Sequence, residues 1–190
     1  MATSGPLYPS TLTPDGSGTD AWSNLTNLSA DDATYATAVI SQYGYTDIVD
    51  ATAFGFAIPG GSTIDGIVVE VQGKADTGAD ANIGSGILLK AGTPTGDNKG
   101  SSDPFVFTAS DTTKTWGGAA DLWGTTWTVS DINNSGFGLQ FSAAANDYVG
   151  TVTVDFVRIT VHYTAAGGGG IPRGVFSKPF RGPFGGSIGW

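Results

Sequence analysis

Short runs of alternating apolar and polar residues limit the fold of this chain more than any other feature. They recur roughly every 8 to 15 residues between Trp22 and Thr164, separated by turns rich in Gly, Pro, Asn and Asp. Alternation with a period of two is typical of β-strands with one buried face. The chain has 30 Gly, only 13% charged residues and few Leu, Lys or Glu, the residue types that long helices favour. The sequence therefore predicts an all-β protein.

Two runs show the alternation most clearly. Residues 67–72 (IVVEVQ) and residues 137–142 (FGLQFS) each place three apolar side chains on one face. The expected buried positions are Ile67, Val69, Val71, Phe137, Leu139 and Phe141. Further strands are expected over residues 51–56, 85–92, 104–110 and 124–130, and a helical turn capped by Ser130 is expected over residues 130–136.

The longest run, residues 150–164 (GTVTVDFVRITVHYT), changes phase in its middle. Val152, Val154 and Phe156 share one alternation, whereas the apolar residues from Val157 onward share the other. A β-bulge near Asp155 would reconcile the two phases, and so would a strand that is covered on both faces. Either arrangement makes this run a central strand. The whole pattern predicts a two-sheet antiparallel sandwich of jelly-roll type.

Composition divides the chain into three parts. Residues 1–20 mix Pro, Gly, Ser and Thr without a period, which predicts an extended N-terminal arm outside the core. Residues 21–166 form the predicted β-sandwich domain, and four consecutive Gly then begin a C-terminal arm over residues 167–190. We expect neither a signal peptide nor a membrane span, because the sequence contains no apolar run suited to either.

Charge is divided between these parts as well. Residues 1–166 hold all 17 acids and five bases, a net charge of −12, whereas residues 167–190 hold three bases and no acid, a net charge of +3. A body this acidic is expected to repel nucleic acid and anionic membranes. The basic arm, in contrast, suits an acidic protein surface, including that of a neighbouring copy.

The C-terminal arm combines its bases with aromatic side chains. The tetrapeptides SKPF and RGPF repeat Pro-Phe, and Pro at this spacing favours an extended path. Solvated linkers usually lack aromatic residues, so these side chains are expected to fill pockets on a partner. The predicted assembly interface consists of Arg173, Phe176, Lys178, Phe180, Arg181, Phe184 and Trp190.

The middle of the chain resembles a family of small β-sandwich proteins encoded in the structural gene clusters of tailed bacteriophages. The resemblance lies in residues 31–37 (DDATYAT), 54–71 (FGFAIPGGSTIDGIVVEV), 116–143 (WGGAADLWGTTWTVSDINNSGFGLQFSA) and 154–164 (VDFVRITVHYT). It covers about residues 22–164 and neither arm. It implies a component of the virion, on the head surface or in the tail, without known catalysis.

Three tryptophans could either bind a glycan or pack within the protein core or a subunit interface. Trp116, Trp123 and Trp127, with Tyr43, Tyr45 and Tyr148, could form an aromatic platform for sugars. Tryptophans at strand and corner positions are also typical of a core or a subunit interface, and we favour this second interpretation because all three lie within the motifs of the resemblance.

The sequence gives little sign of catalysis or of metal binding. With no Cys, and with a single His162 whose strand face also carries Arg158 and Thr160, no nucleophilic triad is indicated. The residues Asp76, Asp80 and Asn82 offer oxygen ligands for Ca²⁺ but lack the spacing of an EF-hand, so a polar loop is the preferred interpretation. We therefore expect no enzyme activity, no metal and no cofactor.

These observations together predict a structural protein of a phage virion, assembled in the cytoplasm of the host bacterium. Capsid decoration or cement is the first interpretation, with the major capsid protein, other virion proteins and further copies of the chain as partners. Symmetric oligomers are the general expectation, and a trimer would suit head decoration. A tail-associated protein and a carbohydrate-binding adhesin are the alternatives.

Overall fold

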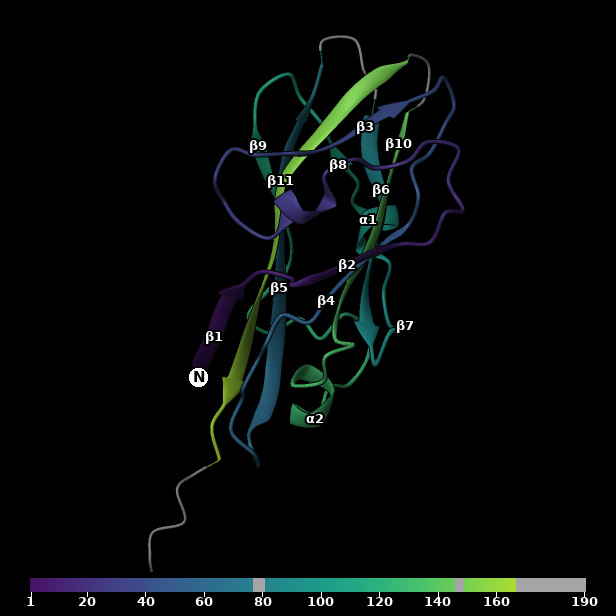
Figure 1. The fold of residues 1–190 in the computed structure, drawn as a ribbon. Coiled ribbons are helices and arrows are strands. Elements are labelled where there is room, and N and C mark those ends of the chain that lie inside the picture. Colours follow the sequence, from purple (N-terminus) through teal and green to yellow (C-terminus); the bar gives the residue numbers. More distant parts are fainter. Residues whose placement is uncertain (77–80, 146–148, 167–190) are drawn as a thin grey trace, which may run out of the picture.

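The computed structural model describes residues 1–76, 81–145 and 149–166. Its strands form two antiparallel sheets that pack face to face (Figure 1). Sheet A contains β1 (Ala2–Leu7), β3 (Ala36–Ile40), β5 (Thr63–Ala75), β9 (Thr112–Gly117) and β11 (Gly150–Thr164). Sheet B contains β2 (Thr11–Pro14), β4 (Val49–Thr52), β6 (Ala81–Lys90), β7 (Thr93–Pro94), β8 (Phe105–Val106) and β10 (Gly138–Ala145). The short helices are η1 (Leu25–Leu28), α1 (Lys99–Ser102) and α2 (Val129–Ile132).

The strand pairs are nested, as in a long hairpin rolled into two layers. The strand β3 pairs with β11, β4 with β10, β5 with β9, and β6 with β7 and β8, so that the chain alternates between the sheets. This winding is that of a jelly roll. The predicted all-β, two-sheet antiparallel sandwich of jelly-roll type is confirmed.

The two inner sheet faces build a core of apolar side chains. The predicted positions Ile67, Val69, Val71, Phe137, Leu139 and Phe141 are all buried. Trp127 and Phe56 meet the ring of Phe137 edge to face, with centroids 5.5 and 5.7 Å away. The alternation of apolar residues along β5 and β10 therefore identified the inward faces correctly.

Both explanations for the phase change in β11 apply. The pairing of β11 with β5 shifts register between Val154 and Phe156, which is the predicted bulge. Beyond it Phe156 faces outward, where Tyr8 meets its ring edge to face at 6.1 Å, and it is nevertheless only 1% exposed. Arg158 covers the same ring and binds Glu70 through two nitrogens, at 2.9 and 3.2 Å. The strand is thus covered on both faces in its middle.

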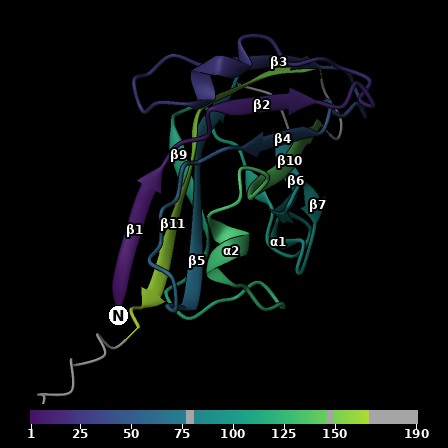
Figure 2. The ribbon, with the colours of Figure 1, turned by 60° about the horizontal axis from the view of Figure 1, so that its bottom comes forward.

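The prediction of a separate N-terminal arm over residues 1–20 is wrong. Figure 2 shows β1 beside β11 and β2 beside β4, and both strands are hydrogen-bonded into the sheets. Leu7 and Leu12 pack against the core. Edge strands have one neighbour and many exposed side chains, so their sequence lacks the apolar alternation of a central strand. Backbone pairing is therefore what joins this Gly- and Pro-rich segment to the domain.

Three local predictions also need correction. The strand β4 ends at Thr52, and β8 spans only Phe105–Val106. Residues 124–128 form no strand: Trp127 lies in a loop, where its indole N–H donates to the carbonyl of Leu122. The cap of α2 is Thr128, not Ser130, because Thr128 and Asp131 form a reciprocal capping box. Among the described residues, no helix is long and apolar enough to cross a membrane.

Candidate functional site

The loop between β3 and β4 presents two tyrosines to solvent. Tyr43 is 70% exposed and Tyr45 is 47% exposed. A tight turn places Tyr43 at its tip, because the N–H of Gly44 donates to the carbonyl of Ser41 at 2.8 Å and Tyr43 adopts a φ of 59°. Exposed aromatic side chains on a closed turn are typical of a binding surface.

The segment from Asp15 to Asp20 holds this loop in place. The carboxylate of Asp20 accepts hydrogen bonds from the backbone N–H of Ser41 at 3.0 Å and from its hydroxyl at 2.6 Å. The N–H groups of Thr19 and Asp20 both donate to the carbonyl of Tyr45. The shape of the loop therefore depends on residues 15–20, which composition had predicted to belong to an N-terminal arm.

Tyr45 continues the outer face of sheet B. It pairs with Ala144 at the end of β10, Ala144 pairs with Asn82 of β6, and Asn82 pairs with Val106 of β8. Paired residues of antiparallel strands point to the same face. Tyr45 thus lies at one end of a row that crosses the sheet to Val106, which is 61% exposed.

Four carboxylates surround the tyrosine loop. The carboxylate of Asp15 accepts a hydrogen bond from the N–H of Ile48, and that of Asp47 accepts one from the N–H of Gly18. Asp50 lies on β4, three residues after Asp47. Asp47 is only 8% exposed and is not part of the surface. We call Tyr43, Tyr45, Asp15, Asp20 and Asp50 the tyrosine surface. Its donors are neutral backbone and side-chain groups, so they order the carboxylates without neutralising them.

The hydrogen bonds keep two of these carboxylates ionised. The hydroxyl and N–H of Ser17 lower the pKa of Asp15 below its ordinary value. Partial burial would raise the pKa of Asp20, but the hydrogen bonds from Ser41 and Thr19 outweigh it and lower the pKa. The tyrosine surface therefore carries fixed negative charge at neutral pH.

The cations of residues 1–166 are all engaged elsewhere. Each of the five bases forms an ion pair with an acid outside the tyrosine surface. The pairs are Lys74–Asp111, Lys90–Asp131, Lys99–Asp121, Lys114–Asp103 and Arg158–Glu70. Within the described ranges, no ion pair reaches Asp15, Asp20 or Asp50, so this part of the surface keeps its negative charge.

The three tryptophans are part of the core, and the glycan-platform alternative is wrong for them. Trp116, Trp123 and Trp127 are 2%, 0% and 7% exposed. The indole N–H groups of Trp116 and Trp123 donate to the carbonyls of Asp103 and Ile67. Because their polar atoms are satisfied inside the domain, these side chains are not available to a sugar or a neighbouring subunit. Of the six aromatic candidates, Tyr43 and Tyr45 are exposed and Tyr148 lies outside the described residues.

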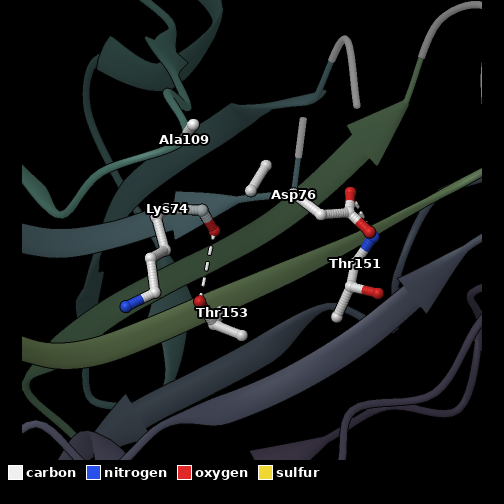
Figure 3. A pocket seen from close by; sticks show the side chains of 6 residues that line it. Lys74, Asp76, Ala109, Thr151 and Thr153 are labelled. Atoms are coloured by element: carbon white, nitrogen blue, oxygen red, sulfur yellow. Dashed lines mark hydrogen bonds between the residues drawn. The ribbon is translucent and has the colours of Figure 1, made fainter. Parts of the chain in front are cut away.

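A shallow depression of about 210 Å³ lies on the outer side of sheet A (Figure 3). Three of its polar side chains, those of Lys74, Asp76 and Thr153, already have hydrogen-bond partners. Lys74 points away from Asp76 in Figure 3, toward the hydroxyl of Tyr35 and the carboxylate of Asp111. Asp76 accepts from the N–H of Thr151. The depression therefore presents few free groups to a ligand.

The remaining predicted sites are distributed as follows. The assembly residues of the C-terminal arm, Arg173 to Trp190, lie outside the described residues, as does Asp80. Within the part of the chain that the structure describes, no three His, Cys, Asp or Glu side chains are grouped as metal ligands. His162 is half-buried on β11, and its Nδ1 has no hydrogen-bond partner among the described residues.

Comparisons with known proteins add only a general likeness. No known family profile matches the chain, and no curated protein matches it in sequence. Among solved structures, one described as "CBM4 structure and function" is 15% identical, with a TM-score of 0.37 over 68% of this chain and 85% of that chain. The N-terminal cellulose-binding domain of Cellulomonas fimi β-1,4-glucanase C is 10% identical, with a TM-score of 0.36 over 69% of this chain and 78% of that chain. The CBM22-1 xylan-binding domain of Paenibacillus barcinonensis Xyn10C is 8% identical, with a TM-score of 0.37 over 87% of this chain and 95% of that chain. The likeness is confined to the β-sandwich architecture, which the strand pairing establishes independently.

Proposed function

We propose that this protein is a non-catalytic structural component of a phage virion, and that it decorates or cements the capsid. The observation that carries the proposal is the division of charge. The five bases of residues 1–166 are all paired within the domain, whereas residues 167–190 carry three bases, no acid and four of the chain's aromatic residues. The chain thus combines an acidic body with a basic, aromatic segment suited to binding a protein surface.

The energetics of such a segment fit an assembly role. Burying one Phe side chain contributes roughly 1.5–3 kcal/mol, so Phe176, Phe180 and Phe184 together can offset much of the entropy lost when the segment becomes ordered. An extended segment of 24 residues reaches about 75 Å at about 3.1 Å per residue. That reach allows contact with the major capsid protein or with a neighbouring copy.

The sandwich itself suits a rigid building block. Its interior is filled by aromatic and branched side chains, and the bases on its surface are held in ion pairs. Binding to a virion would therefore take place on outer surfaces and through the C-terminal segment.

Deletion of residues 167–190 tests the proposal. We expect the shortened protein to remain folded, as judged by circular dichroism, but to be missing from purified particles. Copy number relative to the major shell protein, measured by quantitative mass spectrometry, gives the readout. A matched variant replaces Arg173, Lys178 and Arg181 by Gln and should show partial loss. Normal occupancy by the deletion variant would rule out attachment through this segment, and a few copies per particle for the intact protein would favour the tail over the capsid.

Carbohydrate binding is the second candidate, and exposed Tyr43 and Tyr45 favour it. Aromatic rings beside fixed carboxylates can stack on sugar rings and accept hydrogen bonds from their hydroxyl groups. The test is binding of the intact protein to polysaccharide from the host surface, compared with Tyr43→Ser and Tyr45→Ser variants. Binding that both variants keep would exclude this surface as a glycan site.

A further inference from the structure

The tyrosine surface lies far from the point at which the chain leaves the domain. The strand β11 begins at Gly150, which pairs with Ile40 immediately before the tyrosine loop. It ends at Thr164, which pairs with Thr63. Fifteen residues of strand span about 46 Å to 50 Å at about 3.3 Å per residue. Figure 1 shows the two ends of β11 at opposite ends of the sandwich.

We propose that the tyrosine surface is the docking site for residues 171–190 of a second copy of this chain. This inference rests on the proposed assembly function and names the surface that the segment binds. In each copy, β11 ends at the end of the sandwich that lies away from the tyrosine loop. Copies arranged head to tail therefore bring residues 171–190 of one copy beside the tyrosine surface of the next copy. Docking within the same chain would require the segment to reverse and run back along the whole sandwich.

Charge complementarity supports this occupant. The surface contributes Asp15, Asp20 and Asp50, which have no ion-pair partner within the described ranges. The segment contributes three bases and no acid, namely Arg173, Lys178 and Arg181. Paired charges of this kind raise association rates and fix the orientation of a complex, and salt weakens them.

Apolar complementarity supports it as well. Tyr43 and Tyr45 are the exposed rings of the surface, and Val149 is 65% exposed beside the start of β11. The segment provides Phe176, Phe180, Phe184 and Trp190. Aromatic pairs gain more than the area they bury, and Tyr, Trp and Arg are the residues that most often dominate binding energy at protein interfaces.

Zero-length cross-linking of the full chain tests the proposal. A carbodiimide joins a carboxylate to a lysine amine, and Lys178 is the one lysine of residues 167–190. A mixture of ¹⁵N-labelled and unlabelled protein is cross-linked and analysed by mass spectrometry. We expect Lys178 joined to Asp15 or Asp50 in peptides of mixed isotope content. Cross-links of uniform content only, or to carboxylates at the other end such as Asp65, would overturn the proposal.

Self-association provides a second readout. In sedimentation velocity at low salt, we expect the double variant Tyr43→Ser/Tyr45→Ser to associate about tenfold more weakly than the unaltered protein. Val106→Ser, which alters an exposed apolar residue on β8, is the matched control and should leave association unchanged. Equal association of all three proteins would overturn the proposal. So would loss of polysaccharide binding by the double variant without any change in association, which would assign the surface to a glycan.

These outcomes are separable from failure of the proposed function. If deletion of residues 167–190 strips the protein from particles but the tyrosine variants still associate normally, the assembly role stands and this docking site is wrong. If the deletion leaves particle occupancy normal, the proposed function fails whatever the tyrosine variants do.

Discussion

Asp20 and Ser41, 21 residues apart in the sequence, are joined by two hydrogen bonds of 3.0 and 2.6 Å to one carboxylate. This contact fastens the segment after β2 to the turn that carries Tyr43. The same carboxylate would collide with a side chain at position 44, since a Cβ added to Gly44 would lie 2.4 Å from an oxygen of Asp20. A side chain at position 44 would therefore disturb the loop that presents the tyrosines.

Replacement of Asp20 by Ala should loosen this loop. Hydrogen bonds to a charged group contribute roughly 1.5–3 kcal/mol, so we expect the free energy of unfolding to fall by about 1–2 kcal/mol because the site is only partly buried. Urea unfolding gives the value, and amide hydrogen exchange at Ser41 and Tyr45 locates the effect. Asp65→Ala is the control, since the carboxylate of Asp65 accepts one hydrogen bond within the described residues, from the hydroxyl of Thr164. Equal losses in the two variants would show that Asp20 does not hold the loop.

Truncation of Trp123 should cost much more stability than truncation of Tyr43. Trp123 is fully buried and its indole N–H donates to the carbonyl of Ile67 at 3.0 Å, so Trp123→Ala should cost about 3–5 kcal/mol of stability. Tyr43→Ala removes an exposed ring and should change stability by less than about 0.5 kcal/mol. Thermal unfolding followed by circular dichroism distinguishes them. A small effect at Trp123 would contradict its assignment to the core.

Asp155 should make stability depend on pH in an unusual direction. Burial raises the pKa of this carboxyl above its ordinary value of 3.8, and the negative charges of Asp31 and Asp32 raise it further. Between the ordinary pKa of the unfolded chain and the raised pKa of the folded chain, the folded chain holds more protons than the unfolded chain. The contribution of Asp155 to stability therefore falls as pH rises through that window.

The variant Asp155→Asn tests this sign. It lacks the charge, so we expect it to be at least as stable as the unaltered protein at pH 7, and its advantage should shrink toward pH 4. Urea unfolding at both pH values measures the difference. A deficit in the variant that is the same at pH 7 and pH 4 would mean that the carboxyl acts through hydrogen bonds alone.

The central strands of the two sheets could be predicted because their environment is repeated along the chain. In β5 and β10 every second side chain enters the core, so the apolar pattern predicted their faces. The tyrosine surface could not be predicted in this way. It depends on contacts between residues 15–20 and residues 41–47, and hydrogen bonds between distant polar residues leave no period in a sequence. Packing likewise determines which of the candidate aromatic side chains are exposed. Trp116, Trp123 and Trp127 are buried in the core, whereas Tyr43 and Tyr45 are exposed.

Deletion of the N-terminal residues should destabilise the protein, whereas deletion of the C-terminal residues should not. Deletion of residues 1–14 removes β1 and β2, uncovers Phe156 beneath Tyr8, and takes away Leu7 and Leu12 from the edge of the core. Each buried apolar side chain of this size contributes roughly 1.5–3 kcal/mol, so we expect a loss of at least about 3 kcal/mol or failure to fold. Deletion of residues 167–190 should leave the unfolding temperature unchanged. If the N-terminal deletion also left it unchanged, residues 1–14 would be a separable arm, as their composition alone predicts, and the strand pairing of β1 and β2 would contribute little.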